Sequence, residues 1–189
     1  MADRVEITGA DTLVAEGAVE LLQGARRLSA TRLVYDRAAG LLQIEGPIRV
    51  QEGAGTLLLA DAAELAPDLS EGVLRAVRLV LDQRLQIAAA EARRSRGGQL
   101  FELERSVASS CEVCPGGGPP LWQIRARRVS HDLAARKLIF EHARFELGGL
   151  PIFYLPRLSL PDPSISRASG FLTPSLRSTT TLGPGLELP

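Results

Sequence analysis

The chain has 189 residues, and 22 basic side chains balance 22 acidic ones, so its formal net charge is zero. This balance argues against a nucleic-acid-binding protein, because neutralising phosphates requires clustered Lys and Arg. Aromatic residues make up only 4% of the sequence, so Leu, Val, Ile and Ala must fill the core. The sequence contains no run of about 18 apolar residues, which argues against a helix that spans a bilayer.

Similar segments recur along the first 145 residues, starting at Ala2, Ala30, Ala60 and Ala126. The first three starts are 28 and 30 residues apart. The dipeptide Glu-Gly also recurs, with its glycine at Gly17, Gly46 and Gly72. Repetition at this period predicts a stacked architecture in which each unit packs on its neighbours.

The units alternate between apolar and polar residues, which predicts β-strands with one apolar face. In the segment 41–51 the apolar residues of one parity are Leu42, Ile44, Ile48 and Val50. A glycine at the same place in each unit would bend every strand there, so the stacked strands would fold into a V or a flattened roll. The alanine-rich segments 61–69 and 86–95 are interpreted as strands too, because the repeat requires strands at these places.

Aspartates are expected to begin the turns between strands, because their side chains bond to backbone two residues on. Asp36 and Asp132 match across the repeat, and Asp68 lies in a further turn. His131 beside Asp132 could act as a general acid-base pair. Tyr35 stands at the matching position of the repeat, so we interpret His131 as a residue that flanks a turn.

The two cysteines, Cys111 and Cys114, are separated by two residues. A thioredoxin-like site would need a helix after Cys114, which the Gly- and Pro-rich sequence there cannot begin. A zinc site would need two more ligands, for which the scattered His131 and His142 are a poor set. We favour a structural disulfide, either within the pair or to cysteines elsewhere in a longer chain.

No phosphate-binding loop, nucleophile elbow or carboxylate pair stands out, so we expect no enzymatic activity, no cofactor and no metal. The apolar face is more informative, because it could line a groove that holds acyl chains by dry apolar contact. An ordinary sandwich core would give the same pattern, and the sequence does not separate the two. The groove candidates are Val5, Ile7, Leu42, Ile44, Ile48 and Val50.

Residues 2–48 resemble the OstA-type repeat of lipopolysaccharide (LPS) transport proteins. The later run resembles the LptD family of outer-membrane LPS-assembly proteins, where a periplasmic domain passes into a barrel. Its most specific segments are GLPIFYLPRLSLP, residues 149–161, and RASGFLTPS, residues 167–175. The resemblance covers essentially the whole chain.

The resemblance implies an all-β fold: a bent, stacked-strand β-jellyroll (β-taco) over residues 1–147. A proline-rich junction would follow over 148–170, and the first strand or strands of a truncated transmembrane β-barrel over 171–189. We expect the prolines to end the sheet after Leu147 and the aromatic residues to pack the joint. The junction and gate candidates are Pro151, Phe153, Tyr154, Pro156, Pro174 and Pro189.

In this family, prolines in the first barrel strands are thought to weaken pairing at a lateral gate, a role that falls by motif on Pro174 and Pro189. Family members also link periplasmic cysteines to barrel cysteines, and Cys111 and Cys114 lie in the matching region. This sequence departs from the family's pattern, because both cysteines sit together and neither is near the N-terminus.

The resemblance also implies a function at the outer membrane, with this segment mainly periplasmic. The domain would receive LPS from the bridge protein LptA by strand addition to an exposed edge near Val5 to Ile7. The acyl chains would follow the groove to a barrel that holds the lipoprotein LptE. Alternatives are a soluble periplasmic thiol-disulfide protein, an OstA-type bridge protein, and a β-solenoid that acts on sugars.

Overall fold

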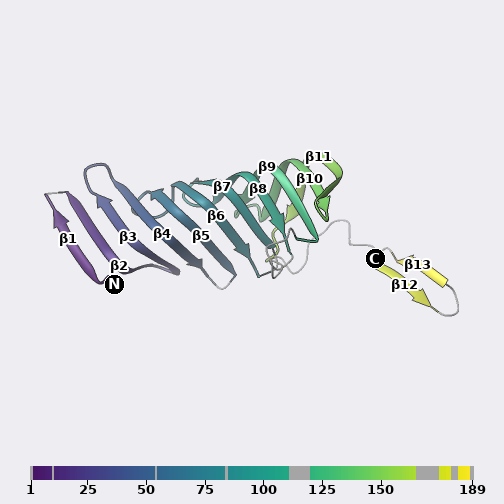
Figure 1. Ribbon diagram of the computed structural model, residues 1–189, viewed down its shortest axis with the longest axis horizontal. Coiled ribbons are helices and arrows are strands. Elements are labelled where there is room, and N and C mark those ends of the chain that lie inside the picture. The colour runs from purple at the N-terminus through teal and green to yellow at the C-terminus, as the bar shows by residue number, and fades with distance from the viewer. Residues whose placement is uncertain are drawn as a thin grey trace.

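The structure is a computed structural model that describes residues 2–9, 11–53, 55–83, 85–110, 120–164, 175–179 and 183–187. Eleven strands form one antiparallel sheet in which each strand pairs with its neighbours in sequence (Figure 1). They are β1 (Arg4–Thr8), β2 (Thr12–Gln23), β3 (Arg26–Asp36), β4 (Leu41–Glu52), β5 (Thr56–Leu65), β6 (Gly72–Leu81), β7 (Leu85–Ser95), β8 (Leu100–Ser109), β9 (Trp122–Asp132), β10 (Lys137–Leu147) and β11 (Leu150–Pro161).

Two further strands, β12 (Ser175–Thr179) and β13 (Gly183–Glu187), pair with each other in a separate sheet. The predicted all-β fold is therefore confirmed, as an open sheet of the β-jellyroll type. Both alanine-rich segments contribute strands, to β5 and β7. Across the described ranges, no helix is long and apolar enough to cross a membrane.

The sequence repeat corresponds to hairpins that add successively to one sheet. Ala30, Ala60 and Ala126 lie near the middle of β3, β5 and β9. The turns repeat as well, since Asp36 accepts a hydrogen bond from the Ala39 N–H at 2.9 Å and Asp132 one from the Ala135 N–H at 2.8 Å. Each repeat is thus a pair of strands that bonds to the next pair.

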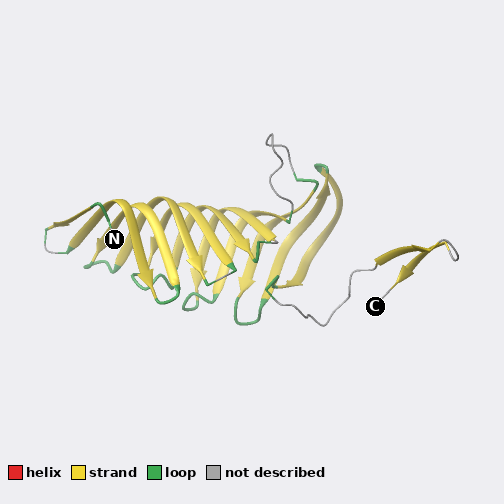
Figure 2. Ribbon diagram, turned by 90° about the horizontal axis from the view of Figure 1, so that it is seen from below, coloured by secondary structure: helices red, strands yellow, loops and turns green. Residues whose placement is uncertain are grey.

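The long strands bend near their middle, so the sheet folds over on itself and the strands arch in side view (Figure 2). At the bend, one position on each strand from β2 to β11 is left out of the register with a neighbouring strand. We call this set the break column: Gly17, Thr31, Gly46, Asp61, Ala76, Ala90, Arg105, Arg127, His142 and Pro156. An interrupted ladder lets a strand bend and twist sharply, so the predicted common bend is confirmed.

Glycine accounts for only part of the break column. Gly17 and Gly46 belong to it, but Gly72 does not, because Gly72 is the first residue of β6. The expectation that the third glycine of the repeat bends its strand is therefore wrong. Ala76, with a φ of 52°, lies at the bend of β6 instead. Position 72 requires glycine because β6 passes very close to β5 there. A Cβ at this position would lie 2.1 Å from the carbonyl oxygen of Glu64.

Folding the sheet places its apolar face inside, where side chains from both halves of each strand meet. Burying a Leu, Ile or Phe side chain stabilises a fold by about 1.5–3 kcal/mol. The largest apolar side chains that are almost fully buried are Leu28, Ile44, Ile48, Leu74, Val77, Leu79, Ile87, Leu103, Val129, Leu138 and Phe140. They come from β3 through β10, so one core runs along the length of the sheet.

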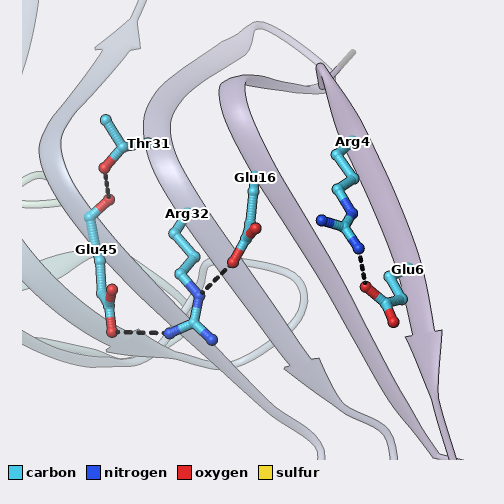
Figure 3. A network of polar contacts seen from close by, with 6 residues as sticks. All are labelled: Arg4, Glu6, Glu16, Thr31, Arg32 and Glu45. Atoms are coloured by element: carbon cyan, nitrogen blue, oxygen red, sulfur yellow. Dashed lines mark hydrogen bonds and ion pairs between the residues drawn. The ribbon is translucent and has the colours of Figure 1, made fainter.

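The outer face carries cross-strand ion pairs, as the alternating sequence predicts. Arg32 on β3 contacts Glu16 on β2 at 3.1 Å and Glu45 on β4 at 3.4 Å (Figure 3). The hydroxyl of Thr31 donates to the carbonyl oxygen of Glu45 and to that of Gly46, two groups beside the break in β4. The same three-residue pattern recurs on β8, β9 and β10 with Glu104, Arg128 and Glu141. Such exposed pairs contribute about 0–1 kcal/mol each.

The expectation that the sheet ends after Leu147 is wrong, because β11 pairs with β10 along almost its whole length. Three prolines lie in β11, at Pro151, Pro156 and Pro161. β11 is an edge strand with a neighbour on one side only, which is where a sheet tolerates proline. The first part of the predicted junction thus belongs to the sheet. The division of the chain into three functional domains stays a prediction.

The close approach at Gly72 predicts an unequal response to the same substitution at two glycines. Gly72→Ala should lower the free energy of unfolding by about 3 kcal/mol or more, because the methyl group would overlap the backbone of β5. Gly53→Ala is the control, since its φ is also positive at 61° but no atom lies within 4 Å of the added Cβ; its cost should stay near 1–2 kcal/mol. Equal losses in chemical denaturation would contradict the assignment.

Candidate functional site

The structure brings four of the predicted groove residues together on the inner face of β4. Their exposed fractions are only 1–5%, and all four belong to the hydrophobic core: Leu42, Ile44, Ile48 and Val50. The described interior is therefore packed against itself, as in a sandwich core, and is not an open groove. An acyl chain would fit there only if the two halves of the folded sheet separate.

The other two groove candidates lie apart from this core, at an edge of the sheet. Val5 and Ile7 are on β1 and have 60% and 71% of their surface exposed. β1 pairs only with residues 12–16 of β2 and has no neighbour on its other side among the described strands. These residues thus belong to an exposed strand edge, which matches the position predicted for strand addition.

A partly buried ion pair joins the two halves of the folded sheet at their rims. Successive strands run in opposite directions, so Glu52 at the end of β4 and Arg94 at the end of β7 belong to opposite halves. The Arg94 guanidinium donates to the Glu52 carboxylate at 2.7 Å, and Arg26 contacts the same oxygen at 2.9 Å. The Arg94 guanidinium also lies 4.7 Å from the ring centre of Phe101. Burial lowers the pKa of Arg94, and the charge of Glu52 opposes that shift.

The turn between β5 and β6 adds an apolar plug at this rim. Leu69 is only 2% exposed and has a φ of 58°, so the turn directs its side chain into the core. Asp68 holds the turn by accepting hydrogen bonds from the N–H and the hydroxyl of Ser70, as the sequence predicts. We call Arg26, Glu52, Leu69 and Arg94 the rim cluster.

His131 flanks a turn, as predicted, but it also has a partner that the sequence did not reveal. Its buried Nε2 lies 2.5 Å from Oδ2 of Asp162, which directly follows β11. Burial opposes ionisation of Asp162, yet hydrogen bonds from Ser164 and from His131 outweigh it and hold the pKa of this carboxyl below its usual value. The contact fastens the end of β11 across β10 to β9, so it has a structural role.

The predicted joint aromatics lie on opposite faces of β11. Phe153 stacks on Phe145 at 5.0 Å between ring centres, and Phe145 stacks on Trp122 at 6.1 Å. The hydroxyl of Tyr154 instead forms a hydrogen bond with Nδ1 of His142 at 2.6 Å. Aromatic pairs of this kind contribute about 0.5–1.5 kcal/mol beyond burial. Both residues therefore fasten β11 to the sheet.

Several predicted residues lie outside the described part of the chain: Cys111, Cys114, Pro174 and Pro189. The disulfide and the gate prolines therefore stay predictions. Within the described ranges, no three His, Cys, Asp or Glu side chains are grouped so that they could hold a metal ion.

The described features define a class of protein: an open β-jellyroll with an apolar interior, a charged rim and two exposed sheet edges. Over the whole length of this chain, its curated homologues are proteins named LPS-assembly protein LptD. It is 29% identical to "LPS-assembly protein LptD" of Nitrosococcus oceani, 26% to that of Saccharophagus degradans and 27% to that of Neisseria gonorrhoeae. The family resemblance seen in the sequence is thereby confirmed.

These alignments include 100% of this chain but only 25%, 21% and 23% of the three relatives. The chain thus spans about a quarter of the length of the curated relatives it matches. No protein-family model matches the sequence.

The rim cluster predicts different responses to loss of charge at two glutamates, one paired with a buried arginine and one with an exposed arginine. Glu52→Gln should lower the free energy of unfolding by about 3 kcal/mol, because it leaves the Arg94 charge buried without its partner. Glu16→Gln removes an exposed partner of Arg32 and should change stability by about 0.5 kcal/mol or less. Urea denaturation of both variants tests this; a loss at Glu52 no larger than that at Glu16 would count against a buried ion pair at the rim.

Proposed function

We propose that this chain is the periplasmic part of an outer-membrane LPS translocon, a transport and assembly component without catalysis. A role in LPS assembly at the outer membrane is supported by the similarity of the whole of this chain to part of proteins named for that role. The observation that carries the proposal further is the single apolar core, which runs unbroken from β2 to β10. Such a surface suits acyl chains, which require only dry apolar contact.

In this proposal the acyl chains of LPS lie between the two halves of the folded sheet, on the inner residues of β4 and its neighbours. Because Ile44 and Val50 are almost fully buried, LPS must separate the halves as it enters. The Arg94–Glu52 pair would break, since it joins the halves at 2.7 Å. Acyl chains would then replace the apolar contacts that the halves make with each other.

The proposed entry is the edge formed by β1, where the bridge protein LptA would add a strand. All five residues of β1 are exposed, and the strand has an unpaired side. An unpaired edge presents backbone donors and acceptors to an incoming strand. LPS would then pass along the sheet from β1 toward β11.

The proposed exit is the outer membrane, reached through the junction after β11 and the barrel strands that begin near residue 171. Pro174 and Pro189 would weaken strand pairing at the gate, because proline cannot donate to a ladder. Cys111 and Cys114 would form disulfides, with each other or with the barrel. The lipoprotein LptE would lie inside that barrel.

Site-specific photo-crosslinking tests the acyl route in the full-length protein. A photoreactive residue at Ile44 or Val50 should capture LPS, because both positions are on the inner face. The same residue at Arg49, which lies between them on the outer face, is the matched control and should capture little. Capture of LPS only from position 49 would contradict the proposed route.

The docking edge can be tested with the same chemistry. A photoreactive residue at Ile7 on β1 should crosslink to LptA, whereas one at Ser159 on the opposite edge strand should not. Both side chains are exposed, so accessibility does not favour either position. If Ser159 captured LptA and Ile7 did not, the proposed direction of transfer would be reversed.

A further inference from the structure

The break column changes its chemistry along the sheet. On β2 to β7 it carries small or acidic residues: Gly17, Thr31, Gly46, Asp61, Ala76 and Ala90. On the next three strands it carries Arg105, Arg127 and His142. Basic side chains thus occupy three adjacent break positions, and only near the β11 end.

These three residues line one cavity on the outer face of the sheet. Its volume is about 460 Å³, and its other polar lining residues are Ser106, Arg125, Arg144 and Tyr154. Four arginines and a histidine therefore surround the cavity, and no acidic side chain lines it. The chain as a whole has no net charge, so four arginines around one cavity are a local excess of positive charge.

Among the described residues, most of this charge has no counter-ion. Arg125 contacts the Glu146 carboxylate at 2.9 Å. In the described part of the chain, Arg105, Arg127 and Arg144 have no acidic side chain within ion-pair distance. Arginines held together without carboxylates favour an anion with several oxygen atoms, above all a phosphate group.

Two of the cavity residues are held in an unfavourable backbone conformation. Arg105 has a φ of 51° and His142 a φ of 53°, in the left-handed region where a Cβ is strained. Gly17 occupies the equivalent place on β2 without that strain. Ala76 has the same conformation at the bend of β6, so the bend imposes this φ, and on β8 and β10 it fixes the place of a basic side chain. The His142 ring is also oriented, since its Nδ1 bonds to the Tyr154 hydroxyl at 2.6 Å.

The neighbouring edge strand, β11, exposes apolar and aromatic side chains. Leu150, Ile152 and Tyr154 are each more than half exposed. Tyrosine and arginine beside apolar side chains are typical of proteins at the level of lipid headgroups.

We propose that the cavity around Arg105, Arg127, His142 and Arg144 binds the phosphate of an anionic phospholipid headgroup. The arginines would donate hydrogen bonds to the phosphate oxygens, and the exposed side chains of β11 would lie against the lipid surface. The site is on the outer face, and of the residues that line the cavity only Ala126 belongs to the apolar core. It would therefore hold the β11 end of the sheet on the membrane without occupying the LPS route.

Flotation of the full chain with vesicles of phosphatidylcholine containing about 30% phosphatidylglycerol tests the site. The double variant Arg127→Gln/Arg144→Gln should bind about 30-fold more weakly, because each arginine near an anionic surface contributes about a fivefold factor. The matched control is Arg49→Gln/Arg78→Gln, which removes the same charge from exposed outer-face positions elsewhere. Its affinity should change about twofold or less.

Equal weakening in the two double variants would overturn the proposal, because it would show general charge attraction only. Failure of the unchanged chain to bind anionic vesicles would overturn it too. Binding of inorganic phosphate without vesicle binding would exclude a lipid headgroup as the ligand. LPS crosslinking from Ile44 should persist in Arg127→Gln/Arg144→Gln, so this test is separate from that of the transport route.

Discussion

The structure depends on one constraint, that a single sheet must bury one of its faces against itself. An antiparallel meander has no second layer to cover it, so the long strands fold at a common level, the break column. A strand that stayed straight between bent neighbours would lose its ladder on both sides. The bend is therefore a property of the sheet, and residues as different as Gly17 and Arg105 occupy equivalent places in it.

The bend also determines in which strands the alternation of apolar and polar residues can be recognised from the sequence. On β4 the inner residues keep one parity through the bend, because Gly46 and Pro47 add a residue relative to β3 and β5. On β9 the inner residues are Ile124 and Ala126 before the bend but Val129 and His131 after it, so the parity changes. An unbroken alternation could therefore be read from the sequence in β4, whereas in β9 and its neighbours it is interrupted at mid-strand.

The distance in sequence between two contacting residues explains which parts of the site could be predicted. Turn aspartates act within a few residues, so Asp36 and Asp132 could be recognised from the repeat. The contacts of Arg94 with Glu52 and of His131 with Asp162 join residues that are 42 and 31 positions apart. Neither pair leaves a pattern in the sequence, since each depends on the way the folded sheet brings distant strands together. The prediction that the prolines of β11 end the sheet was wrong for a related reason. Proline interrupts a sheet only where its strand has neighbours on both sides, and the sequence does not show that β11 is an edge strand.

The two edges of the sheet are built differently, and this gives the sheet a direction. β1 is short, fully exposed and free of proline, so its unpaired side remains available to another strand. β11 carries Pro151, Pro156 and Pro161, which remove donors and discourage further pairing. Aromatic stacking and the His131–Asp162 contact fasten β11 to the sheet, while β1 is held mainly by its pairing with half of β2. The proposed direction of LPS transfer requires this asymmetry: at β1 an edge that a partner strand can join, and at β11 an edge that prolines protect, beside the basic cavity and the exposed apolar side chains.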